Sequence, residues 1–318
     1  MTYAIDSTPL WQPNPATVGE TRMAQFMQAM GHGRYADLWQ WSVDQPEDFW
    51  TNIWRFCGAV GERGNTVLAD GDKMPGARWF PEARLNYAEN LLKDRDAGEA
   101  LVFWGEDKVK RRMTRGELYA EVARFQQFLI AAGVGEGDRV AGYLPNLPET
   151  LVAMLATTAL GAIWSSASPD FGVQGVLDRF GQIEPKVLIC VDGYWYNGKQ
   201  VDCLAKNAEI VAQMPTLLKT VVVPYLNAAP AIGAIANAVC WSELPASDAA
   251  VSFNRVAFDH PLYIMFSSGT TGVPKCIVHC HGGVLLQHLK EHMLHSDVRP
   301  GDRLFYFTTC GWMMWNWL

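Results

Sequence analysis

The sequence predicts an α/β protein in which layered, mostly parallel sheets are flanked by helices. Short apolar runs of strand length alternate with segments of helical periodicity between residues 97 and 223. The chain has 318 residues, of which 49% are hydrophobic, so it can bury a large core in one or two domains. Alternation of this kind is typical of a sheet covered by helices on both faces. Ligands of such sheets bind where the strands reach their carboxyl ends.

Residues 1–96 are expected to form a helical, tryptophan-rich extension that packs on the body of the protein. Aromatic residues crowd the first half of this region, with a spacing typical of packing. Residues 23–30 have helical character, and residues 85–92 carry leucines and an alanine at helical spacing. The extension is therefore predicted to consist of short helices rather than an independent domain.

The first long helix of the body is marked at both ends. Thr114 and Glu117 have the spacing of a capping box, in which each side chain bonds the other residue's backbone N–H. The apolar face of the following helix consists of Leu118, Val122, Phe125 and Leu129. Gly133 is expected to end it.

The remaining elements of residues 97–318 follow the same alternation. Strands are predicted at residues 100–104, 139–144, 162–166, 186–191, 220–223, 261–266 and 303–308. Helices are predicted at residues 148–160, 171–182 and 201–213. Residues 228–238 are rich in alanine and are expected to be a variable surface excursion.

The predicted strand at residues 261–266 is followed by a run of small residues. The run is Ser267, Ser268, Gly269, Thr270, Thr271 and Gly272, and then Val273, Pro274 and Lys275. Glycines and small hydroxyl residues let several backbone N–H groups turn toward one point, which makes a concave anion site. The common NTPase phosphate loop is excluded, because Lys275 does not directly follow the second glycine. We therefore predict a phosphate-binding loop, with a plain surface turn as the alternative.

The composition argues against several classes of function. The net charge of −7 and the pI near 5.5 do not suit a general binder of nucleic acids or anionic membranes. Seven cysteines without paired spacing are typical of the reducing cytosol, and residues 1–10 lack the features of a secretory signal. The longest nearly apolar run, residues 151–164, is too short to span a bilayer. A cytoplasmic protein is therefore expected.

His288, Glu291 and His292 offer a competing, metal-based chemistry. They fit the H-x-x-E-H pattern of one class of zinc peptidase, and His295 extends the row. A solvated helix face explains the same spacing without a metal, because these histidines lie opposite the apolar side of the helix. We prefer the solvated face and predict no resident metal.

The small-residue loop also carries a family resemblance. Residues 267–275, with His279 four residues beyond, are similar to the phosphate-loop signature of the adenylate-forming superfamily, which includes acyl-CoA synthetases and luciferases. Three further stretches resemble acetoacetyl-CoA synthetases, namely residues 10–13, 79–90 and 308–315. Acetyl-CoA synthetases look similar but usually differ at residues 83–84. The chain departs from the commonest superfamily form at Cys276, where glycine usually follows the lysine.

The resemblance implies an ATP-dependent acid–thiol ligase that forms acetoacetyl-CoA from acetoacetate and CoA. An acyl-adenylate would be the intermediate, and AMP and pyrophosphate would be released. ATP, CoA and Mg²⁺ are the implied ligands, with small molecules as the only partners and no nucleic acid or membrane. The alternatives left open are an acetyl- or propionyl-type acyl-CoA synthetase and a non-catalytic nucleotide-binding remnant.

The resemblance also implies roles for single residues. Lys275 would be catalytic at the departing pyrophosphate, and residues 267–272 would bind the phosphates. Lys199 would contact the phosphates of CoA. Trp312 would wall a small acyl pocket or pack in the core.

Two serines are candidates on their position alone. Ser165 and Ser166 end a predicted strand, so they would line the cleft or serve as ordinary strand-end residues.

The resemblance covers about the first half of such an enzyme. Residues 97–318 would be an incomplete large adenylation domain. Most contacts to adenine, ribose and magnesium, together with the lysine of a small C-terminal lobe, would lie beyond Leu318. Residues 310–318, which would expose three tryptophans and two methionines, also point to a truncated sequence, so the fragment is expected to be inactive alone. The oligomeric state is not predicted.

Overall fold

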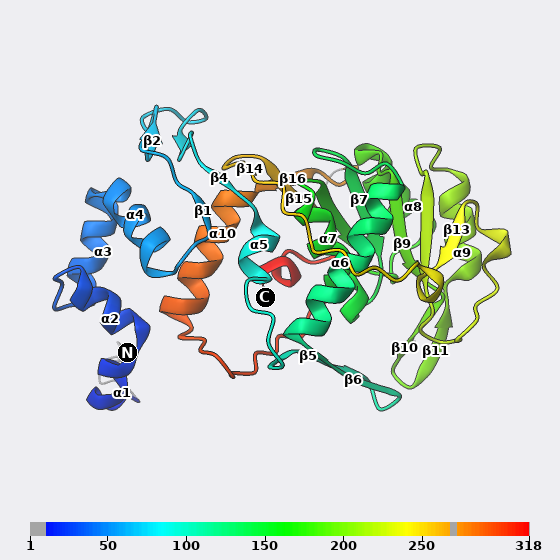
Figure 1. The fold of residues 1–318 in the computed structure, drawn as a ribbon, viewed down its shortest axis with the longest axis horizontal. Helices are drawn as coiled ribbons and strands as arrows, with labels where there is room; N and C mark the ends of the chain where they lie inside the picture. Colours follow the sequence, from blue (N-terminus) through cyan, green and yellow to red (C-terminus); the bar gives the residue numbers. More distant parts are fainter. Residues whose placement is uncertain (1–10, 268–271, 318) are drawn as a thin grey trace, which may run out of the picture. The chain divides into compact units, whose positions relative to one another are not determined.

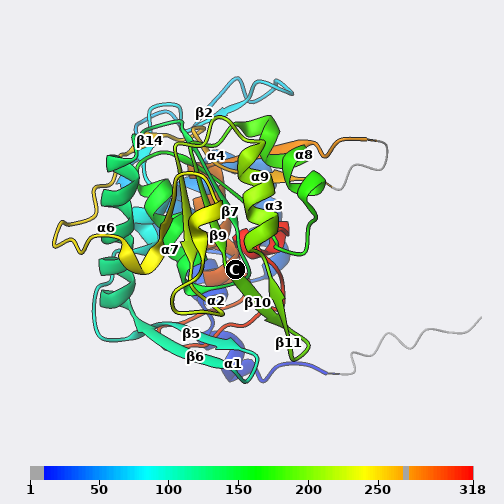
Figure 2. The same ribbon diagram turned by 90° about the vertical axis from the view of Figure 1, so that its right-hand side faces the viewer.

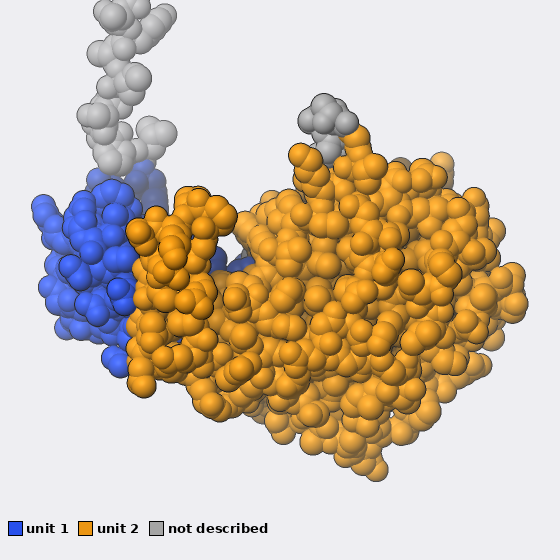
Figure 3. Space-filling model, turned by 90° about the horizontal axis from the view of Figure 1, so that it is seen from above, with its two compact units in different colours: residues 1–59, 286–304 blue, residues 60–285, 305–318 orange. Residues whose placement is uncertain are grey.

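The chain packs as two compact units. In the computed structural model, which describes residues 11–267 and 272–317, one unit is Met1–Ala59 with Leu286–Leu304 and the other is Val60–Leu285 with Phe305–Leu318 (Figure 3). Each unit is assembled from stretches that are far apart in the sequence. The domain boundary predicted between residues 96 and 97 stays a prediction. None of the described helices is long and apolar enough to cross a membrane.

The first unit is a set of short helices around an aromatic core. Its elements are α1 Pro15–Glu20, α2 Arg22–Ala29, α3 Tyr35–Asp44, α4 Pro46–Phe56, the end of α10 His281–Lys290 and the π-helical turn η3 Glu291–His295. Phe26, Leu38 and Ile53 are buried together with Leu294 of η3. The backbone N–H of Arg22 donates to the Asp297 carboxylate at 2.9 Å. Residues 15–56 therefore form short packed helices, whereas residues 61–85 of the predicted helical extension contain four short strands.

A seven-stranded sheet forms the centre of the second unit. In spatial order its strands are β13 Ala238–Cys240, β12 Lys219–Val223, β9 Val187–Val191, β7 Arg139–Tyr143, β8 Ile163–Ala167, β15 Pro261–Phe266 and β16 Cys276–Cys280. All neighbours are parallel except β15 and β16. Every residue of β8 and β9 is buried, which is why the sequence shows continuous apolar runs there. The predicted mostly parallel α/β fold is confirmed.

Helices cover both faces of this sheet. Helices α6 Arg115–Ala131 and α7 Pro148–Ala159 lie on one face, and α8 Val173–Ile183 and α9 Leu204–Ala212 lie on the other (Figures 1 and 2). The short helix α5 Tyr87–Leu91 packs against α7. Helix α9 begins three residues later than predicted, because residues 199–202 belong to a strand instead.

Several small sheets decorate the second unit. A three-stranded sheet contains β1 Gly61–Glu62, β4 Arg84–Leu85 and β14 Val256–Ala257, and the two-stranded sheets pair β2 Leu68–Ala69 with β3 Arg78–Trp79, β5 Glu99–Gly105 with β6 Val109–Thr114, and β10 Gly193–Tyr196 with β11 Lys199–Asp202. The 3₁₀ turns are η1 Ile232–Ala234, η2 Trp241–Glu243 and η4 Met313–Trp317. The strand predicted at residues 100–104 is thus present, but it belongs to an antiparallel hairpin rather than to the main sheet.

The strand predicted at residues 303–308 is wrong for this structure. Residues 303–309 have no regular secondary structure, and Phe305 and Phe307 are 83% and 84% exposed. A strand is stable only when a neighbour satisfies its backbone groups. Within the described residues, no segment forms backbone hydrogen bonds with residues 304–307. The apolar pattern was therefore insufficient to make a strand here.

The capping box predicted before α6 is present. The Thr114 hydroxyl accepts from the Glu117 N–H at 3.1 Å, and the Glu117 carboxylate accepts from the Thr114 N–H at 2.7 Å. We expect Thr114→Ala to lower the free energy of unfolding by about 1 kcal/mol, because α6 loses its cap. Thr114→Ser should retain most of the stability. Urea unfolding measures both variants, and equal losses in the two would contradict the capping role.

The buried His281 makes the stability of the second unit depend on pH. Its side chain is 0% exposed, and its Nδ1 accepts from the Tyr87 N–H at 3.2 Å. Burial, helped by the nearby His260, lowers the pKa of His281 to about 3. In the unfolded chain the pKa of histidine is about 6.5. Below about pH 6.5 the unfolded chain therefore binds a proton that the folded chain excludes, and stability falls as the pH drops.

This pH dependence can be measured against a variant that does not titrate. Between pH 7.5 and 5.5, His281 is expected to remove about 1.4 kcal/mol of unfolding free energy. In His281→Asn an amide oxygen can accept the Tyr87 N–H, so this variant should lose that much less over the same interval. Urea unfolding at the two pH values gives the difference. Identical pH profiles would show that His281 has the same pKa in the folded and the unfolded chain, which would contradict its burial as a neutral side chain.

Candidate active site

The predicted phosphate loop connects β15 to β16 at the carboxyl end of β15. Because β15 is parallel to β8, this end lies on the same edge of the sheet as the carboxyl ends of β7, β8 and β9. The Ser267 N–H donates to the Lys275 carbonyl at 3.0 Å and closes the turn. Ser268, Gly269, Thr270 and Thr271 lie outside the described residues. The loop therefore stands where ligands of parallel sheets bind.

The exit of the loop is open to solvent. Gly272 has a φ of +155°, and among the described residues no heavy atom lies within 4 Å of where its Cβ would stand. Lys275 is exposed, so its ammonium group is available to an anion. Pro274 is buried. None of the described residues would therefore have to move for an anionic group to reach Gly272.

Gln182 holds the loop exit in place, and sequence reasoning missed it. This residue lies in the last turn of α8, and its Nε2 donates to the Pro274 carbonyl at 2.9 Å. The Cys276 thiol donates to the Gln182 side-chain oxygen at 3.7 Å. A glutamine near a helix end carries no local signal of such a role. The cysteine that departs from the usual glycine is therefore part of the same contact.

Residues 168–171, which follow β8, lie at the same edge of the sheet. The Tyr143 hydroxyl donates to the carbonyls of Phe171, at 2.5 Å, and Pro169, at 3.1 Å. The Lys206 ammonium donates to the Pro169 carbonyl at 2.6 Å. Burial raises the pKa of Tyr143, so its hydroxyl stays protonated and can donate. Hydrogen bonds from Tyr143 and Lys206 therefore fix the backbone of residues 168–171.

Asp170 connects this segment to the β10–β11 hairpin by a hydrogen bond. Its carboxylate accepts from the Ser168 hydroxyl and from the Tyr194 hydroxyl of β10, both at 2.8 Å. Burial and the bond to Asp170 raise the pKa of Tyr194. Two segments that follow different strands are thus fixed to each other at the same edge of the sheet.

The serines at the end of β8 already have partners. Ser165 is fully buried, and its hydroxyl donates to the Ile264 carbonyl at 2.8 Å. The Ser166 hydroxyl donates to the Cys310 carbonyl at 2.7 Å. These bonds join β8 to β15 and to the end of the chain. Of the two roles proposed for these serines, the geometry favours the structural one.

Trp312 does not pack in the core of this chain. Its side chain is 69% exposed, although the residues around it are anchored. Gly311 lies against the backbone of Ser168, and the Trp315 Nε1–H donates to Asn146 at 2.9 Å. The core-packing interpretation of Trp312 is therefore wrong, and its role in an acyl pocket stays a prediction.

Lys199 lies in the turn region of the β10–β11 hairpin and is exposed. The neighbouring Gly198 N–H donates to the Glu106 carboxylate at 2.9 Å, so this turn meets the turn of the β5–β6 hairpin. The Lys108 ammonium stands 5.8 Å from the centre of the Trp195 ring. A second cation thus lies against the hairpin that carries Lys199.

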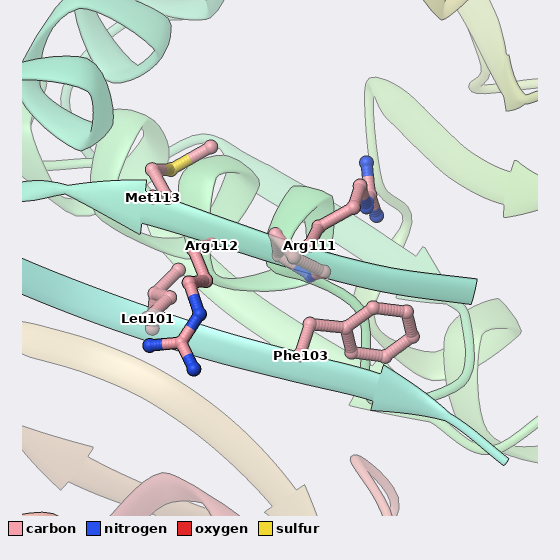
Figure 4. Close-up of a pocket in the computed structure, with 6 residues that line it drawn as sticks. Leu101, Phe103, Arg111, Arg112 and Met113 are labelled. Carbon is pink, nitrogen blue, oxygen red and sulfur yellow. The ribbon is translucent and has the colours of Figure 1, made fainter. Parts of the chain in front are cut away.

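A small pocket lies on one face of the β5–β6 hairpin (Figure 4). Its lining residues are Leu101, Phe103, Arg111, Arg112, Met113 and Pro148. Two Arg111 nitrogens donate to the two oxygens of the Glu149 carboxylate at 2.6 and 2.8 Å. This guanidinium is already neutralised and most of the lining is apolar, so the pocket does not have the chemistry of a phosphate site.

The row of histidines does not form a solvated face. His288 is buried, and its ring centre lies 6.0 Å from that of His292. The Glu291 carboxylate accepts from Lys290 at 2.7 Å and from Gln287 at 2.9 Å. The predicted solvated face is therefore wrong for His288, because this side of the helix contributes to packing. Within the described residues, no group of three or more His, Cys, Asp or Glu side chains could hold a metal ion.

Comparisons with known proteins agree with this arrangement. Residues 92–317 match the family model "AMP-binding enzyme", and residues 35–91 match "Acetyl-coenzyme A synthetase N-terminus". The chain is 54% identical to acetoacetyl-coenzyme A synthetase of Rhizobium meliloti over 98% of this chain and 49% of the relative. It is 43% identical to acetoacetyl-CoA synthetase of Mus musculus over 97% of this chain and 48% of the relative.

A solved structure shares the fold as well. Acetoacetyl-CoA synthetase from Streptomyces lividans matches with a TM-score of 0.91 and 44% identity, over 98% of this chain and 49% of that one. The chain therefore spans about half the length of these relatives. The resemblance to acetoacetyl-CoA synthetases found in the sequence is confirmed. This chain belongs to the family of AMP-binding enzymes.

Proposed function

We propose that this chain is the ATP-phosphate-binding part of an acetoacetate–CoA ligase. The observation that carries the proposal is the 54% identity to an acetoacetyl-coenzyme A synthetase over 98% of the chain. The location of the predicted phosphate loop, at the carboxyl edge of a mostly parallel sheet, supports it. In this proposal residues 97–318 are part of the large adenylation domain.

The proposed reaction has two halves. First, the acetoacetate carboxylate attacks the α-phosphorus of ATP, which forms acetoacetyl-AMP and expels pyrophosphate. Then the CoA thiol attacks the acyl carbon and expels AMP. The protein's main task in the first half is to stabilise the negative charge that grows on the leaving pyrophosphate.

The residues present suit that task. Backbone N–H groups and hydroxyls of residues 267–272 would donate to the phosphates, and Lys275 would add a positive charge at the exposed exit. Among the described residues, none occupies the space beside Gly272 that an oxygen of the phosphate chain would need. Mg²⁺ would neutralise part of the ATP charge, and Lys199 would contact the CoA phosphates.

Partner and location follow from the same proposal. The partners are small molecules, namely a short carboxylic acid, ATP and CoA. We propose a cytoplasmic location, which is supported by the seven cysteines, all of them free thiols.

Carboxylate-dependent exchange of labelled pyrophosphate into ATP tests the first half-reaction directly. The chain should be assayed alone and after fusion to the second half of the Rhizobium meliloti relative. We expect exchange with acetoacetate in the fusion only. Acetate or propionate as the better substrate would favour the short-chain acyl-CoA synthetase alternative. Binding of ATP without exchange for any short acid would favour a non-catalytic remnant and would overturn the proposal.

A further inference from the structure

The β10–β11 hairpin depends on contacts with other segments for its orientation. Its two strands form a two-stranded sheet of their own. A single hairpin of this kind is at best marginally stable in water. At its base the Cys203 N–H donates to the Asp192 carbonyl at 2.9 Å, and at its tip the Gly198 N–H donates to the Glu106 carboxylate at 2.9 Å. Bonds to neighbouring segments therefore decide where the hairpin stands.

A third bond joins the middle of the hairpin to residues 168–171. The Tyr194 hydroxyl donates to one oxygen of the Asp170 carboxylate at 2.8 Å, and the other oxygen accepts from the Ser168 hydroxyl at 2.8 Å. Tyr143 and Lys206 fix the backbone of this segment from the main sheet and α9. Asp170 therefore attaches the hairpin to a segment that is itself held in place.

The hairpin face that meets Asp170 also carries Lys199. Residues two apart on a strand share a face, and so do residues directly opposite each other on paired strands. Tyr196 lies two residues after Tyr194 and directly opposite Lys199. Trp195 is on the other face, where the Lys108 ammonium stands 5.8 Å from its ring centre. The tyrosine that bonds Asp170 thus lies on the same side of the hairpin as the predicted CoA-phosphate residue.

The position of Lys199 depends on the backbone of the hairpin. Its side chain is exposed, and lysine is a point charge on a flexible stem, so only the strand beneath it can define where the charge lies. A hairpin that is already fixed has less conformational freedom to lose when a ligand binds. We propose that Tyr194 and Asp170 are positioning residues for CoA, because their hydrogen bond orients the hairpin so that Lys199 meets the CoA phosphates. The inference rests on the proposed function, in which Lys199 makes that contact.

The sign of the charge on Asp170 separates positioning from simple electrostatics. A carboxylate on the Lys199 side of the hairpin repels the phosphates of CoA. If the charge were its main effect, Asp170→Ala would tighten CoA binding. If its bond to Tyr194 is the main effect, the same substitution weakens CoA binding. Asp170→Asn removes the charge but keeps an oxygen that can accept from the Tyr194 hydroxyl.

Calorimetric titration with CoA tests the inference on the chain fused to the second half of the Rhizobium meliloti relative. We expect Tyr194→Phe and Asp170→Ala each to raise the Kd for CoA by about tenfold, because each removes a hydrogen bond to a charged group. Asp170→Asn should bind CoA nearly as well as the unchanged fusion. The double substitution Tyr194→Phe and Asp170→Ala should be no weaker than the worse single one, since both break the same bond.

Two further measurements exclude a general loss of structure. Pyrophosphate exchange does not require CoA, so Tyr194→Phe should leave its rate unchanged. Hydrogen exchange at residues 193–202 of the 318-residue chain should become faster in Tyr194→Phe than in the unchanged chain. Tyr35→Phe is the matched control, because it removes the hydroxyl of a tyrosine that is 53% exposed in the first unit, and it should change none of these values.

Three results would overturn the inference. An unchanged Kd for CoA in Tyr194→Phe would show that the bond does not position the hairpin. Tighter binding of CoA by Asp170→Ala would show that its charge dominates. A fall in pyrophosphate exchange as large as the fall in CoA affinity would mean that the bond only stabilises the fold. By contrast, CoA binding that depends on Tyr194 in a fusion without any exchange would support the inference while the ligase proposal fails.

Discussion

Replacement of Lys275 by methionine is expected to lower acetoacetate-dependent pyrophosphate exchange by about a hundredfold or more. Methionine keeps the length of the side chain but removes the charge at the exposed exit of the loop. Loss of one group that stabilises charge in a transition state typically costs about 3–4 kcal/mol. The exchange rate of the chain fused to the second half of the relative gives the effect, and the affinity for ATP should fall less than the rate.

Two controls make this result specific to the loop. Lys93→Met removes an exposed lysine elsewhere on the same unit and should leave exchange unchanged. Lys199→Met should also leave exchange unchanged but raise the KM for CoA in the complete reaction, because exchange does not require the thiol. If Lys275→Met and Lys93→Met exchange equally fast, Lys275 has no role at the pyrophosphate.

Replacement of Asn86 by alanine is expected to destabilise the second unit by about 3 kcal/mol. Asn86 is fully buried, and its Nδ2 donates to the carbonyls of Thr158, at 2.9 Å, Ala159, at 3.1 Å, and Asn254, at 2.8 Å. Its oxygen also caps α5 by accepting from the Glu89 N–H at 3.2 Å. Alanine would leave these carbonyls buried without a donor and remove the cap, and each loss costs about 1 kcal/mol or more.

Urea unfolding, followed by one probe in each unit, measures this effect and that of the comparison variant. Asn52→Ala provides the comparison in the first unit, because the Asn52 side chain donates to the Asp48 carbonyl at the surface of α4. We expect that substitution to cost less than about 0.5 kcal/mol. A similar small loss for Asn86→Ala would mean that water replaces the missing donor.

Local pattern predicted the elements whose partners are close in sequence or whose burial is complete. The β8 and β9 strands appear as apolar runs because both of their faces are covered. The capping box at Thr114 was visible because its two members are three residues apart. The prediction of a strand at residues 303–308 was wrong, because an apolar pattern does not show whether a neighbouring strand is present to pair with it.

In the candidate site too, local sequence predicts some features and misses those that depend on distant residues. The small-residue run after β15 predicts a phosphate loop, since its composition alone suits an anion, and this role stays a prediction. Gln182 and Asp170 were missed, because their partners lie 92 and 24 residues away along the chain. Ser166 was correctly placed at a strand end, but its bond to Cys310 spans 144 residues. No periodicity links residues at such separations.

The sequence by itself determined the α/β class, the order of most strands and helices along the chain and the family, and it predicts the position of a phosphate loop. These depend on periodicity, capping and motif spacing, all of which act over a few residues. Only the tertiary structure decided which carbonyls Asn86 satisfies, that residues 286–304 join the N-terminal helices, and that His288 is buried. The physical reason is that burial and hydrogen-bond partners are set by segments far apart in the chain, which meet only when it folds.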